Sequence, residues 1–272
     1  MKKTVVFTDL DGTLLDYSTY SFEKAFPALL SLRQRGIPLV ICSSKTRSEI
    51  EHYREKLENH HPFIVENGGG IFIPVGYFDF DVKSGAYDIS EEDDYCVLRL
   101  GARYSVLRRA IGDLRGEGFP VRGFGDMPAE EVAALTGLSL EKAAMAKERH
   151  FDEPFILIDS GRQAKDLRRA IEQKGLTFTE GRFFHLLGNS DKGKAVSILI
   201  SFYRRQFGDL TTFGLGDGPN DIPMLREVDQ AAIVQRPDGS YDSRIDLPKL
   251  IRAEGIGPGG WNRAVEELIR SV

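Results

Sequence analysis

Short apolar runs alternate along the chain with stretches in which apolar residues recur at helical spacing. The runs cover residues 4–8, 38–42, 63–66, 211–215 and 231–234 and are rich in Val, Ile and Leu. Because they are continuously apolar, they predict parallel strands that are covered on both faces. The pattern therefore predicts an α/β fold with a doubly wound, Rossmann-like parallel-sheet core.

Apolar stripes between these runs predict the helices that cover the sheet. One stripe runs through Phe22, Phe26 and Leu29 and stops before Gly36. From Trp261 to Ile269, apolar residues follow the offsets 0, 3, 4, 7 and 8 of one helix face. We expect this last helix to pack on the sheet, after a glycine-rich loop at 255–260.

Residues 82–187 interrupt the alternation. An acidic stretch at 91–94, which we interpret as a solvated surface, precedes a strand-like segment at 95–100. Helical patterns follow, with another strand-like segment at 155–158. We expect an inserted α+β domain at 82–187, large enough for a small core of its own, and a main domain built from 1–81 and 188–272.

Composition narrows the class of protein. The 272 residues are 41% hydrophobic, carry a formal charge of −5 and include two cysteines without disulfide or zinc spacing. Lys and Arg are scattered, which argues against a nucleic-acid partner. No apolar stretch approaches the roughly 20 residues of a membrane span, and no signal-peptide core follows Met1. We expect a cytoplasmic protein without a membrane or nucleic-acid partner.

Polar residues that could take part in catalysis follow the predicted strands. Asp9 and Asp11 end the first run, Ser43 follows the second, and Asp217 follows the fourth. Ligands bind at the carboxyl ends of parallel strands, so these side chains should face one crevice. Aspartate is a weak nucleophile toward a phosphate dianion unless cations offset the repulsion. Lys192, which opens a helical pattern, is a candidate for one of these cations.

The motifs Asp9-x-Asp11-x-Thr13, Ser43, Lys192 and Gly216-Asp217-x-x-Asn220-Asp221 occur in this order. Together they resemble the motifs of the haloacid dehalogenase-like phosphatase superfamily, over nearly the whole length of the chain. The resemblance implies that 82–187 is a cap domain. It also implies that Asp9 is the nucleophile that forms an aspartyl-phosphate, and that Asp11 is the general acid and base.

The same resemblance implies a metal and a phosphate site. Like charges 4 Å apart repel by about 4 kcal/mol at an effective dielectric constant of 20, which Lys192 alone cannot offset. A hard divalent cation, most simply Mg²⁺, is therefore expected. The residues implied as its ligands or as holding its bound water are Asp9, Asp11 through its carbonyl, Asp217, Asn220 and Asp221. The residues implied for the phosphate are Leu10 through its backbone, Thr13, Ser43 and Ser44.

Further strings resemble one branch, the mannosyl-3-phosphoglycerate phosphatase family. They include Ser44-Lys45-Thr46-Arg47, Glu66-Asn67-Gly68-Gly69-Gly70 and Gly181-Arg182-Phe183-Phe184-His185, although Glu180-Gly181 stands where a glycine pair is commoner. The resemblance implies a small phosphorylated sugar-glycerate substrate, converted from mannosyl-3-phosphoglycerate to mannosylglycerate and phosphate. Candidate substrate ligands are Lys45, Glu66, Asn67, Arg182 and His185.

Two alternatives remain at this stage. One is a broader sugar-phosphate phosphatase or a glucosyl-3-phosphoglycerate phosphatase, which would share every catalytic residue. The other is a non-enzymatic phospho-acceptor switch, which also uses an aspartate, a lysine and Mg²⁺. Asp11, Thr13 and the large insertion favour turnover over signalling. The sequence leaves the hexose and the oligomeric state open.

Overall fold

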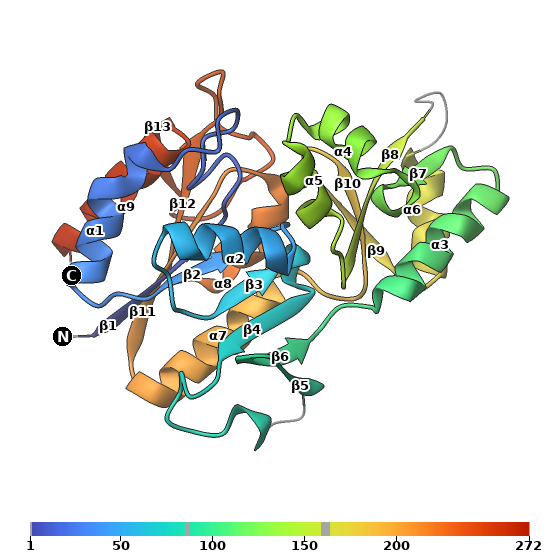
Figure 1. Cartoon of the computed structure of the whole chain (residues 1–272). Coiled ribbons are helices and arrows are strands. Elements are labelled where there is room, and N and C mark those ends of the chain that lie inside the picture. The colour runs from blue at the N-terminus through green and yellow to red at the C-terminus, as the bar shows by residue number, and fades with distance from the viewer. Residues whose placement is uncertain (1, 85–86, 159–163, 272) are drawn as a thin grey trace.

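A computed structural model describes residues 2–84, 87–158 and 164–271, which form two sheets with their covering helices (Figure 1). The larger sheet has nine strands. In spatial order they are β13 (Ile251–Ile256), β12 (Gln230–Gln235), β11 (Leu210–Gly216), β1 (Lys3–Thr8), β2 (Leu39–Cys42), β3 (Phe63–Val65), β4 (Gly70–Pro74), β6 (Tyr95–Arg99) and β5 (Ile89–Glu92).

The six strands from β13 to β3 are parallel, and the remaining three add to them antiparallel. All five apolar runs are strands of the parallel part. The predicted α/β class with a parallel, doubly wound core is confirmed. The antiparallel extension was not expected.

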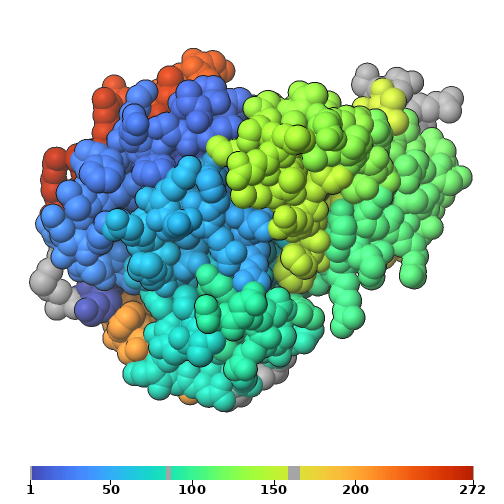
Figure 2. Space-filling view, viewed as in Figure 1, coloured from blue at the N-terminus to red at the C-terminus, as the bar shows by residue number. Residues whose placement is uncertain are grey.

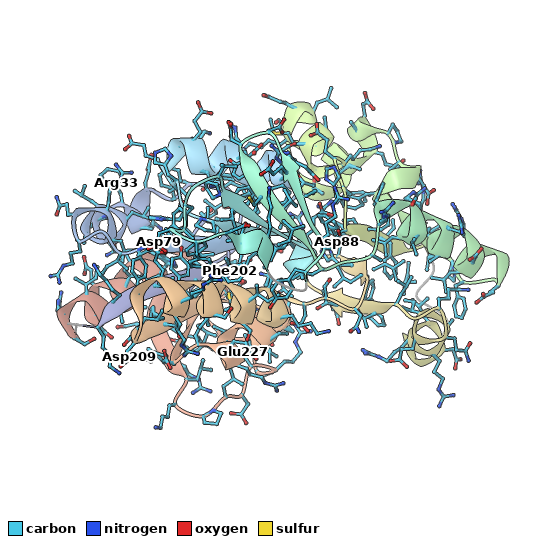
Figure 3. The ribbon with its side chains drawn as sticks, turned by 90° about the horizontal axis from the view of Figure 1, so that it is seen from below. Arg33, Asp79, Asp88, Phe202, Asp209 and Glu227 are labelled. Atoms are coloured by element: carbon cyan, nitrogen blue, oxygen red, sulfur yellow. The ribbon has the colours of Figure 1, made fainter. Side chains whose placement is uncertain are left out.

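Helices cover both faces of this sheet. One face packs against α1 (Phe26–Gln34), α2 (Arg47–Lys56) and α9 (Pro258–Ser271), and the other against α7 (Lys192–Phe207) and α8 (Ile222–Glu227). Along β1, Val6 joins the first core, whereas Val5 and Phe7 join the second. Seen from below, α7 lies across its face of the sheet and carries Phe202 (Figure 3). Both faces are thus apolar, which explains the continuous apolar runs.

The C-terminal helix packs on the sheet as predicted. Trp261 is fully buried, and its indole Nε1 donates a hydrogen bond of 2.9 Å to Thr8 Oγ1. The expectation of a loop at 255–260 was wrong, because β13 continues to Ile256 and α9 begins at Pro258. Gly255, with φ of 122°, lies where the strand ends against the helix start.

A second, four-stranded sheet forms a separate layer, on the right in Figure 1. Its order is β7 (Val121–Gly123), β8 (Asp152–Leu157), β10 (Phe184–Leu187) and β9 (Thr177–Glu180). The remaining helices are α3 (Tyr104–Gly116), α4 (Ala129–Thr136), α5 (Leu140–Ala146) and α6 (Ala164–Gln173). Leu107, Phe155 and Ile171 belong to a core that this unit buries for itself.

The start of the inserted domain differs from the expectation. Residues 89–99 were assigned to it, but β5 and β6 hydrogen-bond to β4 and extend the nine-stranded sheet. The local pattern could not show this, because a strand's partner is set by long-range pairing. We propose that the cap comprises residues 102–187. No helix in the described ranges is both long and apolar enough to cross a bilayer.

Candidate active site

The two acidic motifs meet at the carboxyl edge of the parallel sheet. Asp9 follows β1 and Asp217 follows β11, and these neighbouring strands pair Thr8 with Leu215. One carboxylate oxygen from each of Asp9, Asp217 and Asp221 lies within 4.8 Å of the others. The sequence motifs that are about 200 residues apart therefore form one cluster, as the edge rule predicts.

Lys192, the first residue of α7, lies inside this cluster. Its ammonium is 2.6 Å from Oδ1 of Asp9 and 2.6 Å from Oδ1 of Asp221. Asp221 Oδ2 also accepts hydrogen bonds from the backbone N–H groups of Asp217 (3.0 Å) and Gly218 (3.1 Å). Both oxygens of Asp221 are thus engaged, so this residue positions the lysine and the turn after β11.

The electrostatics of the cluster leave a demand for positive charge. Burial raises the pKa of Asp9 to about 7 despite the nearby Lys192 ammonium. Burial, together with Asp221 and Asp9, raises the pKa of Asp217 well above its ordinary value. Burial lowers the pKa of Lys192, but Asp221 and Asp9 outweigh it and raise that pKa. Three carboxylates around one ammonium fit a hard divalent cation, which prefers oxygen ligands.

A glycine lets the two motifs approach each other. Gly12 has φ of 76°, and a Cβ atom there would lie 2.7 Å from Asp217 Oδ2. This close approach lets Thr13 Oγ1 donate a hydrogen bond of 3.2 Å to Asp217 Oδ1. The hydroxyl predicted to hold phosphate is therefore used here to hold the Asp217 carboxylate.

Asp11 lies beside the cluster with one oxygen paired and one unpaired. Its Oδ2 is 3.0 Å from the Lys45 ammonium, which also lies 3.1 Å from Glu49 Oε1. Its Oδ1 is buried and has no hydrogen-bond partner among the residues that the structure covers. Burial lowers the pKa of Lys45, but Asp11 and Glu49 outweigh burial and raise that pKa above its ordinary value. An unpaired oxygen near Asp9 suits a group that exchanges a proton with a ligand.

Asp9, Asp11 and Asp217 line a cavity of about 470 Å³ to which both domains contribute. The predicted residues that line it are Asp9, Asp11, Ser44, Lys45, Arg182, His185, Asp217 and Asn220. Aromatic side chains complete its wall. They are Tyr17 and Tyr20 from the segment between β1 and α1, and Phe124 and Phe183 from the cap. This mixture of apolar and charged groups suits a polar ligand with an anionic end.

Three of the predicted phosphate ligands, Leu10, Thr13 and Ser43, do not line the cavity. Ser43 is fully buried, and its Oγ accepts a hydrogen bond of 3.3 Å from the Lys45 N–H. The Leu10 side chain belongs to the hydrophobic core, so only its backbone can reach a phosphate. Ser44, which lines the cavity, is better placed than Ser43.

Glu66 and Asn67, two of the predicted substrate ligands, are buried and do not line the cavity. Glu66 is fully buried, and its carboxylate accepts hydrogen bonds from the N–H groups of Phe151 (2.8 Å) and His150 (3.0 Å) in the cap. Burial raises the pKa of Glu66 to about 8. Glu66 and Asn67 both have positive φ, of 50° and 55°, and neither residue lines the cavity.

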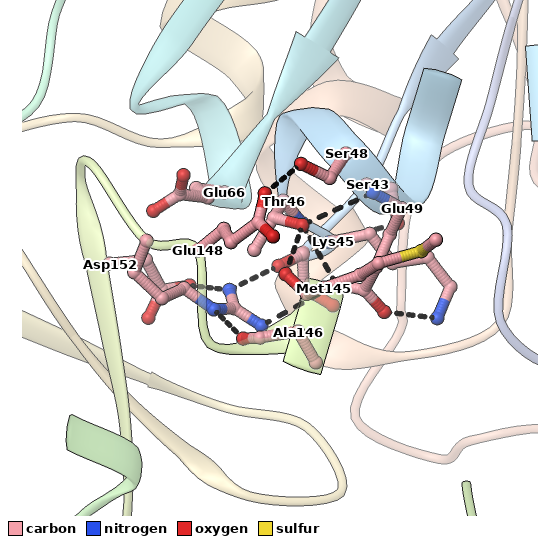
Figure 4. Close-up of polar contacts among 12 residues, drawn as sticks. Ser43, Lys45, Thr46, Ser48, Glu49, Glu66, Met145, Ala146, Glu148 and Asp152 are labelled. Atoms are coloured by element: carbon pink, nitrogen blue, oxygen red, sulfur yellow. Dashed lines mark hydrogen bonds and ion pairs between the residues drawn. The ribbon is translucent and has the colours of Figure 1, made fainter. Parts of the chain in front are cut away.

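Polar contacts join the cap to the loop before α2 (Figure 4). Thr46 Oγ1 donates to the carbonyl of Met145 (2.9 Å), and Arg149 Nη1 donates to the carbonyl of Ser44 (2.7 Å). The space-filling view shows this part of the cap packed directly on the core (Figure 2). The cap therefore contacts the same loop that presents Ser44 and Lys45 to the cavity.

The sequence analysis missed two arginines that line the cavity from the main domain, Arg236 and Arg244. Arg236 follows β12, and its Nη2 lies 3.1 Å from Asp242 Oδ2. Arg244 Nη2 lies 2.7 Å from the same oxygen, and all three residues line the cavity. The edge rule that identified Asp217 could have found Arg236, because it follows the next apolar run.

Comparisons with known proteins agree with this geometry. Residues 6–77 match the haloacid dehalogenase-like hydrolase family. A glucosyl-3-phosphoglycerate/mannosyl-3-phosphoglycerate phosphatase from Methanococcoides burtonii is 47% identical, over 98% of this chain and 97% of that protein. A mannosyl-3-phosphoglycerate phosphatase from Pyrococcus furiosus is 39% identical, over 85% and 90%. A solved phosphatase of the haloalkanoate superfamily, BT1666 from Bacteroides thetaiotaomicron, has a TM-score of 0.68 at 15% identity, over 100% and 96%.

The parallel sheet, the inserted cap and the acidic cluster around a lysine define a haloacid dehalogenase-like hydrolase. Within that class, the 47% identity to the Methanococcoides burtonii protein over nearly the full length identifies one family. The chain belongs to the mannosyl-3-phosphoglycerate phosphatase family.

Proposed function

We propose that this protein is an Mg²⁺-dependent phosphomonoester hydrolase that acts through an aspartyl-phosphate and converts mannosyl-3-phosphoglycerate to mannosylglycerate and phosphate. The observation that carries the proposal is the cluster of Asp9, Asp217 and Asp221 around Lys192, of which Asp9 and Asp217 line a cavity between the two domains. The names of the full-length relatives support the substrate class.

In the first step, a carboxylate oxygen of Asp9 forms a bond to phosphorus while the bond from phosphorus to the glycerate oxygen breaks. Asp11 gives its proton to the departing alkoxide. In the second step, water attacks the phosphorus of the aspartyl-phosphate, and Asp11 takes a proton from that water. Phosphate leaves and the Asp9 carboxylate is restored, so atoms and charges balance over the cycle.

Positive charge must offset the phosphate dianion beside these carboxylates. Lys192 supplies one charge at Asp9. Mg²⁺, held by Asp9, the Asp11 carbonyl and Asp217, would supply the remainder by neutralising the phosphoryl oxygens. Asn220 lines the cavity on this side and would help to hold bound water.

The glycerate carboxylate needs a second cationic site. Arg182 lines the cavity, and its guanidinium lies 5.9 Å from the Tyr17 ring and 5.7 Å from the Phe183 ring. Arg182 is the arginine among the predicted substrate ligands, and it lines the cavity from the cap. We assign it to the carboxylate, where a planar guanidinium can make two parallel hydrogen bonds.

A glucosyl-3-phosphoglycerate phosphatase activity is the second candidate, because the relative at 47% identity carries both sugars in its name. The test is Mg²⁺-dependent phosphate release from mannosyl-3-phosphoglycerate, glucosyl-3-phosphoglycerate, mannose 6-phosphate and glucose 6-phosphate. We expect kcat/KM for a glycosyl-3-phosphoglycerate to exceed that for either hexose phosphate by about 100-fold or more. Similar values on all four would contradict the substrate assignment.

A further inference from the structure

His185 lines the cavity and has one ring nitrogen held by a carboxylate. It lies on β10 in the cap, and its Nδ1 is 2.8 Å from Asp152 Oδ2 and 3.0 Å from Oδ1. A carboxylate oxygen accepts hydrogen bonds, so a ring that carries one hydrogen has it on Nδ1 and leaves Nε2 as an acceptor. Within the described ranges no side chain or backbone group is hydrogen-bonded to Nε2.

Asp152 is itself held firmly. It is fully buried on β8, accepts a hydrogen bond of 2.9 Å from Asn67 Nδ2, and lies 3.7 Å from Arg149 Nη1. The nearby guanidinium offsets the cost of a buried carboxylate. His185 is thus oriented by a charged group that cannot rotate without breaking contacts in the core.

The same contacts continue to the metal side of the site. Asn67 Oδ1 accepts a hydrogen bond of 3.3 Å from Asn220 Nδ2, and Asn220 lies in the motif that contains Asp217. The turn that carries Asn67 is fixed against α7, since a Cβ atom on Gly68 would lie 2.1 Å from the carbonyl oxygen of Asp191. A continuous series of hydrogen bonds therefore joins the cap histidine to the catalytic edge of the sheet.

We propose that His185 Nε2 accepts a hydrogen bond from a hydroxyl of the substrate's sugar, and that Asp152 and Asn67 are positioning residues that hold His185 and join it to Asn220. This inference rests on the proposed function. A hydroxyl fits Nε2 because it donates a hydrogen, which the substrate's carboxylate cannot do. The adjacent Phe124 and Phe183 rings line the same cavity and suit the apolar face of a hexose.

The inference predicts a loss that depends on the sugar. His185→Ala should lower kcat/KM for mannosyl-3-phosphoglycerate by about 10- to 100-fold, mainly through KM, since one hydrogen bond to the substrate disappears. Hydrolysis of p-nitrophenyl phosphate, which has no sugar, should change less than about 3-fold. The affinity for 3-phosphoglycerate, measured as its inhibition of that reaction, should also stay within about 3-fold. His150→Ala, an exposed histidine of the same cap segment, is the matched control and should change none of the three values.

The positioning role has its own test. In Asp152→Ala, His185 Nδ1 and Asn67 Nδ2 lose the Oδ2 acceptor that they share, so we expect the same sugar-dependent loss as in His185→Ala. Asp152→Asn is the conservative variant, because its amide oxygen can take the Oδ2 position and accept from both groups. It should keep at least about a third of the preference for mannosyl-3-phosphoglycerate over p-nitrophenyl phosphate. If Asp152→Ala does not fold, His185→Ala and Asp152→Asn decide the question.

The outcomes separate the inference from the proposed function. Equal losses on all substrates in His185→Ala, or an unchanged preference for the sugar-bearing substrate, would overturn the role of His185. A preference in Asp152→Ala equal to that of wild type, or one in Asp152→Asn no better than in Asp152→Ala, would overturn the positioning role. Wild-type protein that does not hydrolyse any glycosyl-3-phosphoglycerate would instead contradict the proposed function, before any variant is considered.

Discussion

The Lys45 ammonium lies 3.0 Å from Asp11 Oδ2, and Lys45 is nearly fully buried. Lys45 was predicted to bind substrate, but its ammonium is shared between Asp11 and Glu49. The pair fixes the group that we expect to transfer the proton. This contact therefore links the loop after β2 to the catalytic step.

Replacing Lys45 should impair the chemistry more than substrate binding. In Lys45→Met we expect kcat for mannosyl-3-phosphoglycerate to fall by about 100-fold, the lower end of what a positioned acid or base contributes, with KM within about 3-fold. Steady-state kinetics measure both values. Lys142→Met is a matched control, because Lys142 lies over the same Tyr20 and Tyr53 rings and makes no salt bridge within residues 2–84, 87–158 and 164–271. A rise in KM with unchanged kcat would return Lys45 to the role of substrate ligand.

Asp217→Asn should raise the free energy of unfolding in chelator but increase the Mg²⁺ concentration that activity requires. Removing one of three crowded carboxylates relieves repulsion, so the variant should be more stable than wild type in chelator by on the order of 1–2 kcal/mol. It should also need roughly 10- to 100-fold more Mg²⁺ for half-maximal activity. Chemical denaturation in chelator and Mg²⁺ titration of activity measure these effects. A variant that is less stable in chelator and has unchanged Mg²⁺ dependence would show that no cation is shared at Asp217.

Glu66 should act on stability through the cap. Glu66→Ala leaves the buried N–H groups of His150 and Phe151 without their acceptor, so we expect a loss of about 2–4 kcal/mol in the free energy of unfolding. Chemical denaturation measures it. Glu148→Ala, on the exposed side of the same segment, should cost less than about 0.5 kcal/mol. Equal effects of the two substitutions would be inconsistent with an anchoring role for Glu66.

His61 should make the protein less stable in mild acid. Burial, with Arg54 and His60, lowers the pKa of His61 to about 4, and its Nδ1 lies 2.7 Å from the Tyr77 hydroxyl. Because the folded state binds this proton more weakly than the unfolded state, the stabilisation is present above about pH 6.5 and is lost as the pH falls toward 4. The group should contribute a loss of about 2 kcal/mol between pH 7 and pH 5.

The measurement is the free energy of unfolding of wild type and His61→Gln at both pH values. The variant should be less stable at pH 7 but should show a smaller decrease on acidification. A decrease of the same size in both proteins would mean that other groups cause the acid sensitivity.

The fold and the catalytic cluster could be predicted because they follow from local patterns and one geometric rule. Apolar runs identified β1 and β11. Because the carboxyl ends of parallel strands meet at one edge of the sheet, the sequence also predicted that Asp9 and Asp217 lie close together. The environment of the predicted substrate ligands could not be predicted in the same way. The role of Glu66 depends on hydrogen bonds from the cap, and the burial of Asp152 depends on contacts between distant segments. Neither property can be predicted from the spacing of apolar and polar residues.

The most direct test of the account is phosphate release from mannosyl-3-phosphoglycerate by wild type and Asp9→Asn, each measured with Mg²⁺ and with chelator. We predict rapid release only by wild type with Mg²⁺, and a loss of at least about 10⁴-fold in Asp9→Asn, because the variant lacks the attacking carboxylate. Asp9→Asn should stay folded, since its replacement is isosteric. Activity of folded Asp9→Asn comparable to wild type, or wild-type activity that is undiminished in chelator, would contradict an aspartyl-phosphate mechanism built on one shared cation.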